Sequence, residues 1–76
     1  MISCFIFLFG LCIEENLEGG ALLILSDKSA WRIKKEDISI SALWLMPSPI
    51  EIIEEEEGYR LENLYSKSSV HAQIQH

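Results

Sequence analysis

The sequence predicts a small all-β domain, either an SH3-like or OB-like barrel or a compact sandwich, of about five to six short antiparallel strands. Short runs of apolar or alternating residues recur along the chain, and polar turns or prolines separate them. About five or six strands within roughly 60 residues are typical of a small barrel. Because an isolated hairpin is only marginally stable, we expect these strands to close over one shared core.

The chain begins with an apolar segment, residues 1–12, that differs from the acidic remainder. Its apolar run ends at Ile13, and a helix of that length would reach only about 20 Å, short of the roughly 30 Å hydrocarbon core of a bilayer. One interpretation is a secretory leader that lacks its basic start and is cleaved before Ile13. A second is a buried first strand, with Phe5, Phe7 and Phe9 on one face. A third is a membrane-surface anchor.

These interpretations predict different locations for the protein. Removal of residues 1–12 predicts a periplasmic or secreted protein, whereas their retention predicts a cytoplasmic one. Membrane contact is expected only through this segment. In each case residues 13–76 are expected to form a single small β domain.

Both cysteines, Cys4 and Cys12, lie in this apolar segment. Their spacing matches no metal site and no reactive thiolate, so we interpret them as inert small apolar residues. A disulfide between them would require the segment to be retained and to turn back on itself.

The first predicted hairpin joins the apolar runs Ala21–Leu25 and Ala30–Ile33. A two-residue loop at Asp27–Lys28 would pair Leu25 with Ala30. Lys28 is unfavourable where φ is positive, so a longer loop with shifted pairing is the alternative. The two-residue loop places one set of side chains on the core face: Leu22, Ile24, Trp31 and Ile33.

Two connections flank this hairpin. Residues 14–18 form either a helical turn or a flexible lead-in, which Gly19 and Gly20 end. Lys34–Asp37 is a polar connection that suits a single helical turn.

The remaining strands follow in order. Ile38–Ser41 alternates and merges into the apolar stretch Ala42–Met46, which the Pro47-Ser48-Pro49 sequence ends. Ile50–Ile53 predicts the next strand, and Glu54–Glu57 an acidic turn that protects it from edge-to-edge pairing. Alternation then predicts strands around residues 59–63 and 70–75. Within the first of these, Asn63 is expected to satisfy a backbone group.

Together these segments give a candidate core for the domain. Its members come from every predicted strand. They are Leu22, Ile24, Trp31, Ile33, either Leu43 or Trp44, Ile50, Ile52, Tyr59, Leu61, Val70, Ala72 and Ile74.

The segment from Leu25 to Ile33, followed by Trp44, Leu61–Asn63 and Val70–Ala72, resembles small uncharacterised bacterial all-β proteins. The shared features are an Asp-x-Ser-x-Trp hairpin, a second Trp and a closing Val-x-Ala strand. This chain departs from that pattern at Lys28, where the pattern has Gly. The resemblance implies an exported origin, because such proteins often follow signal peptides, and it implies no catalytic residue.

Charge and spacing exclude several function classes. Lys and Arg number 6 against 12 Asp and Glu, a formal net charge of -6, which opposes nucleic-acid binding. His71 and His76 would point to opposite faces of a strand, so they cannot share a metal ion. Glu54–Glu57 is expected to be a solvated loop. No nucleophile, base and oxyanion-donor set is recognisable, so we expect no enzyme, cofactor, metal or small-molecule substrate.

The remaining function class is binding to a protein or peptide. Trp44 and Tyr65 are the candidate partner-binding residues, because periodicity leaves their faces undecided. The sequence therefore predicts a non-enzymatic exported interaction or structural module. The alternative is a cytosolic interaction domain or oligomer subunit in which Phe5–Leu8 supplies an added strand.

Overall fold

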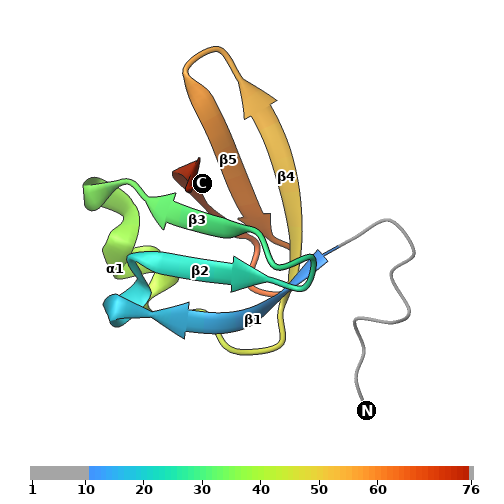
Figure 1. The fold of residues 1–76 in the computed structure, drawn as a ribbon. Coiled ribbons are helices and arrows are strands. Elements are labelled where there is room, and N and C mark those ends of the chain that lie inside the picture. Colours follow the sequence, from blue (N-terminus) through green and yellow to red (C-terminus); the bar gives the residue numbers. More distant parts are fainter. Residues whose placement is uncertain (1–10, 76) are drawn as a thin grey trace.

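The computed structural model describes residues 11–75, which form a closed barrel of antiparallel strands (Figure 1). The strands follow the order β1-β2-β3-β6-β5-β4 around the barrel. The predicted small antiparallel barrel is therefore confirmed. The strands are β1 (Leu11–Leu17), β2 (Leu22–Leu25), β3 (Ala30–Ile33), β4 (Pro49–Glu55), β5 (Gly58–Asn63) and β6 (Ser68–Gln75).

Closure of the barrel depends on the first residues of β1. Among residues 11–75, Leu11 pairs with Ile50 and Cys12 pairs with Pro49, which joins β1 to β4. The boundary placed after residue 12 therefore falls inside a strand. Residues 14–17 also belong to β1, so the expected helical turn or flexible lead-in is wrong there.

Cys12 is buried and disulfide-bonded, so its interpretation as an inert apolar residue is wrong. Cys4, the strand expected around Phe5, Phe7 and Phe9, and His76 lie outside the described residues.

The hairpin of β2 and β3 has the longer loop. Leu23 pairs with Trp31, and the N–H of Leu25 donates to the carbonyl of Ser29 at 3.0 Å, which leaves three residues in the loop. The third of these, Lys28, has φ of 73°, as a three-residue hairpin loop with a left-handed last position requires.

This one-residue shift changes which side chains face the core. Leu23 and Leu25 are fully buried, whereas Leu22 and Ile24 are only partly buried. The expected inward orientation of Leu22 and Ile24 is therefore wrong.

The connection between β3 and β4 is helical and irregular rather than extended. It begins with the 3₁₀ turn η3 (Lys35–Asp37), which confirms the predicted helical turn, and continues as the single α-helical turn α1 (Ile38–Ser41). The strand expected from Ile38 to Met46 is therefore wrong. The hydroxyl of Ser41 donates to the carbonyl of Gly20 at 2.6 Å, in the 3₁₀ turn η2 (Glu18–Gly20). This hydrogen bond holds α1 against η2.

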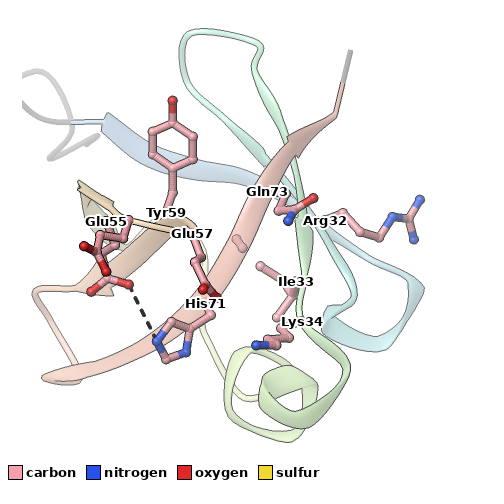
Figure 2. A pocket seen from close by; sticks show the side chains of 10 residues that line it. Arg32, Ile33, Lys34, Glu55, Glu57, Tyr59, His71 and Gln73 are labelled. Carbon is pink, nitrogen blue, oxygen red and sulfur yellow. Dashed lines mark ion pairs between the residues drawn. The ribbon is translucent and has the colours of Figure 1, made fainter.

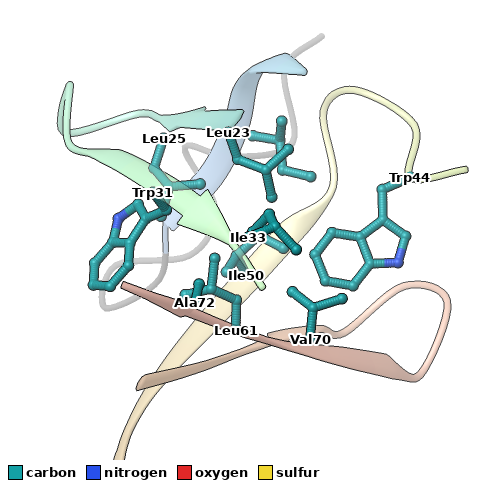
Figure 3. Close-up of a cluster of buried hydrophobic side chains, with 10 residues drawn as sticks. Leu23, Leu25, Trp31, Ile33, Trp44, Ile50, Leu61, Val70 and Ala72 are labelled. Atoms are coloured by element: carbon teal, nitrogen blue, oxygen red, sulfur yellow. The ribbon is translucent and has the colours of Figure 1, made fainter. Parts of the chain in front are cut away.

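The core fills the barrel with side chains from all six strands, and Trp44 enters it from the loop after α1 (Figure 3). Leu43 is 79% exposed, so of the two alternatives Trp44 is the core residue. Ile74 is also exposed, contrary to expectation. The cluster consists of Ile13, Leu23, Leu25, Trp31, Ile33, Trp44, Ile50, Leu61, Val70 and Ala72, with Leu11, Ile38, Ile52 and Tyr59 packed against it.

Candidate functional site

An open cleft of about 550 Å³ lies between β3, β6 and the turn that joins β4 to β5 (Figure 2). Glu55 at the end of β4 and Glu56 and Glu57 of the following turn form its acidic wall. The side of the cleft formed by β3 carries two cationic side chains, Arg32 within β3 and Lys34 directly after it. The cleft therefore has an acidic side and a basic side.

His71 of β6 connects the cleft to the helical segment before α1. Its backbone N–H donates to Oδ2 of Asp37 at 2.8 Å, and its ring Nδ1 lies 3.0 Å from the same oxygen. The backbone hydrogen bond is the main cause that lowers the pKa of Asp37, and the imidazole and Lys34 add to the effect. The contacts between His71 and Asp37 therefore link β6 to η3.

The second ring nitrogen of His71 also faces a carboxylate. Nε2 lies 3.7 Å from Glu55, whose other oxygen is 3.1 Å from Nε of Arg60. Both nitrogens of His71 are thus directed at acids, and neither contacts a hydroxyl or thiol of residues 11–75 that it could activate as a nucleophile. This arrangement suits a structural role, in which His71 links β6 to the acids Asp37 and Glu55.

Two further findings concern residues 11–75. They contain no group of three or more His, Cys, Asp or Glu side chains able to hold a metal ion. Within the same range, no helix has the length and apolar character needed to cross a membrane.

A second surface consists of exposed apolar side chains on two loops. In the loop before β4, Leu43, Leu45 and Met46 are 79%, 66% and 53% exposed. In the turn between β5 and β6, Leu64 and Tyr65 are 39% and 72% exposed. We call these five residues the apolar loop cluster.

Hydrogen bonds hold the two loops beside one another. The N–H of Leu64 donates to the carbonyl of Pro49 at 2.9 Å. The indole N–H of Trp44 donates to Oγ of Ser68 at 2.8 Å, across from the first loop to the start of β6. The two loops that carry the five apolar side chains therefore lie side by side.

The two residues expected to bind a partner have different positions. Trp44 is 5% exposed and anchors its loop in the core, so it supports the surface without forming much of it. Tyr65 is largely exposed within the apolar loop cluster and stays a candidate contact.

Sequence reasoning missed Leu43, Leu45 and Met46 as surface residues. They flank Trp44 in a continuous apolar run, and such a run carries no periodic signal to show which member is buried. The adjacent Pro47-Ser48-Pro49 sequence was the available signal, because it places this run in a loop.

Comparison of the chain with models of protein families, with curated proteins and with solved structures found no match.

Proposed function

We propose that the chain is a non-enzymatic interaction module that binds a partner protein through the apolar loop cluster. The observation that carries this proposal is the exposure of five large apolar side chains on two adjoining loops. Contiguous apolar surface on a small soluble protein commonly marks a contact site. The exposed Tyr65 fits this role, because aromatic side chains are enriched at protein interfaces.

The loops that carry the cluster are held by internal hydrogen bonds. The amide of Asn16 donates to the carbonyls of Ser41 and Trp44, at 2.9 and 3.2 Å. Oδ1 of Asn63 accepts the N–H groups of Tyr65 and Ser66, at 2.9 and 3.0 Å. Because the loops are already ordered, binding loses less conformational entropy than it would with mobile loops.

The surroundings of His71 support the non-enzymatic part of the proposal. Its ring lies between Asp37 and Glu55, an arrangement that holds the imidazole between two negative charges. Such a ring stabilises the contact between neighbouring elements. It is not placed against a nucleophile in the described part of the chain.

Site-specific photo-crosslinking in cells of the source organism tests the proposal. A photoreactive residue at Leu45 is expected to capture a defined protein, whereas the same residue at the exposed Lys35 is not. The captured protein is then purified and its affinity for the full chain is measured by calorimetry. Leu45→Ser is expected to weaken binding about tenfold, the loss typical of a central apolar contact.

The matched control is Ile74→Ser, which removes an exposed apolar side chain from β6, outside the cluster. Its affinity is expected to equal that of the unmodified chain. Equal losses for the two variants, or the same protein captured from Lys35, would contradict the proposal. Capture of a second copy of the chain, with a dimer in light scattering, would instead support the oligomer-subunit alternative.

A further inference from the structure

The cleft between β3, β6 and the β4–β5 turn has an apolar floor. Ile33 pairs with Ala72, and Ala72 pairs on its other side with Tyr59, so the three residues form a row across β3, β6 and β5. Residues that face one another in antiparallel strands point to the same side of the sheet. All three line the cleft. Its volume of about 550 Å³ lies within the range of about 300–1,000 Å³ that is typical of small-molecule sites.

Two charged side chains of the cleft are already paired. Nη1 of Arg32 lies 2.9 Å from Glu18, and its Nε donates to Gln75 at 3.0 Å. Figure 2 shows the guanidinium of Arg32 directed away from Glu55. Glu55 itself lies 3.1 Å from Nε of Arg60. The charges of Arg32 and Glu55 are therefore largely satisfied by the protein.

Three other charged side chains of the cleft are Lys34, Glu56 and Glu57, and all three are exposed. None of them takes part in an ion pair or a side-chain hydrogen bond within residues 11–75. The charge of Lys34 helps to lower the pKa of Asp37, but the first cause of that shift is the N–H of His71, which Asp37 accepts. The cleft thus offers one cation on its β3 side and two carboxylates on the side of the hairpin turn.

These charges of opposite sign select the kind of ligand that fits the cleft. A simple cation would leave Lys34 unpaired, and a simple anion would be repelled by Glu56 and Glu57. In a free amino acid the two charged groups are bonded to one carbon atom. In an extended tripeptide they are about 10 Å apart, at roughly 3.3–3.6 Å per residue. A cleft whose opposite charges are not in contact therefore suits a short peptide with free ends.

We infer that this cleft binds a short peptide through both of its charged ends. The N-terminal ammonium lies against Glu56 and Glu57, and the C-terminal carboxylate lies against Lys34. Apolar side chains of the peptide cover the floor formed by Ile33, Ala72 and Tyr59. The site shares no residue with the apolar loop cluster, so it does not depend on the proposed function.

A nuclear magnetic resonance titration of the full chain tests the inference. The probe is the tripeptide alanyl-valyl-alanine with free ends, and the controls are the same peptide with an acetylated N-terminus or an amidated C-terminus. Amide shifts are expected to be largest at Lys34 and Glu57 and to weaken with added salt. Each cap is expected to weaken binding about two- to fivefold, the effect of one exposed ion pair. Free valine is expected to bind more weakly than the tripeptide.

A substitution on the basic side tests the role of Lys34. Lys34→Gln is expected to weaken binding of the free tripeptide about two- to fivefold. The matched control is Lys35→Gln, which removes an exposed charge of the same sign outside the cleft and should leave the affinity unchanged.

A second pair of variants tests the acidic side. Glu56→Gln combined with Glu57→Gln is expected to weaken binding by a similar factor. The matched control combines Glu36→Gln with Glu51→Gln, which are exposed acids outside the cleft.

The capped peptides test the orientation of the ligand. Lys34→Gln should weaken binding of the acetylated peptide but not of the amidated peptide, which has no carboxylate to pair with Lys34. The double variant of Glu56 and Glu57 should show the opposite pattern. A general disturbance of the cleft would instead weaken all of the peptides equally, and that result would contradict the inference.

Several further results would overturn the inference. These are no binding of the free tripeptide at millimolar concentration, equal binding of free valine, or shifts concentrated at the apolar loop cluster. Equal affinities of Lys34→Gln and Lys35→Gln would also overturn it. Circular dichroism of each variant confirms that the barrel is folded.

Discussion

Ser29 accepts a hydrogen bond from the indole Nε1 of Trp31 at 2.8 Å. The hydroxyl of Ser29 in turn donates to Oδ1 of Asp27, which also accepts the backbone N–H of Ser29 at 2.9 Å. The three residues thus form a hydrogen-bonded chain from the exposed turn to a buried core indole. The spacing of Ser29 and Trp31 allows this hydrogen bond, because alternate residues near the start of a strand lie on the same side.

Ser29→Ala is expected to lower the free energy of unfolding by about 1–2 kcal/mol, because the indole N–H of Trp31 loses its acceptor and Asp27 loses a donor. Urea denaturation followed by Trp fluorescence measures the change. Ser39→Ala, at an exposed position of α1, is the control and should change stability by less than about 0.5 kcal/mol. Equal stability of the two variants would contradict this account.

Asp37→Asn is expected to destabilise the protein in a pH-dependent way. The pKa of Asp37 is lowered in the folded protein, chiefly by the N–H of His71, so its contribution is present above the unfolded pKa of about 3.9. It is lost as the pH falls through the lower, folded value. At pH 7 the variant should be about 1 kcal/mol less stable, less than a fully buried charged hydrogen bond contributes, because water partly screens this carboxylate.

Denaturation of both proteins at pH 7 and near pH 2 tests this prediction. The difference between Asp37→Asn and the unmodified chain should shrink toward zero in acid. A difference of unchanged size at both pH values would show that the carboxylate charge is not responsible.

Trp44→Ala and Tyr65→Ala are expected to differ in their effect on stability, because Trp44 supports the apolar loop cluster from the core and Tyr65 lies on its surface. Trp44→Ala removes a core side chain and should lower stability by about 3–5 kcal/mol. Tyr65→Ala removes an exposed ring and should change stability by less than about 0.5 kcal/mol. Thermal unfolding measures both effects, and a large loss for Tyr65→Ala would show that its ring is structural.

Gly20→Ala is expected to be among the most destabilising substitutions in the chain. Gly20 has φ of 101°, and a Cβ there would lie 2.5 Å from the backbone nitrogen of Ala42. Backbone strain and overpacking together should lower stability by about 3 kcal/mol. The control is Gly19→Ala, also at positive φ but with open space around the new methyl group, and it should lose only about 1 kcal/mol. Equal losses would mean that the contact with Ala42 is relieved.

We expect the mature protein to retain Leu11 and Cys12, so that any cleavage of the chain occurs before Leu11. Cleavage before Ile13 would remove the pairs of Leu11 with Ile50 and of Cys12 with Pro49, which join β1 to β4 in the described part of the chain. The intact mass of protein purified from its native source measures the N-terminus directly. A folded native chain that begins at Ile13 would show that the barrel does not need these pairs.

Several features of the barrel were predictable because they depend on local periodicity. The alternation of Tyr59, Leu61 and Asn63 places them on one face of β5, with Leu61 and Asn63 fully buried. Asn63 satisfies backbone N–H groups of the following turn, as expected. His71 lies on the exposed face of β6, whose alternation was equally clear.

Other features were not predictable, because adjacent apolar residues carry no periodic signal. In the run from Leu22 to Leu25 both faces are apolar, so a shift of one residue exchanges two similar faces. The same ambiguity affects Leu43 and Trp44. The contact between His71 and Asp37 joins positions 34 residues apart, and no local pattern predicts it.

The sequence by itself determined an acidic all-β domain of short strands, because strand period and turn chemistry are local properties. Only the tertiary structure decided the register at Lys28, the burial of Trp44 and the helical turn at Ile38–Ser41. These three features depend on which strands pair when the barrel closes. Closure determines which apolar side chains are buried and which backbone groups form hydrogen bonds.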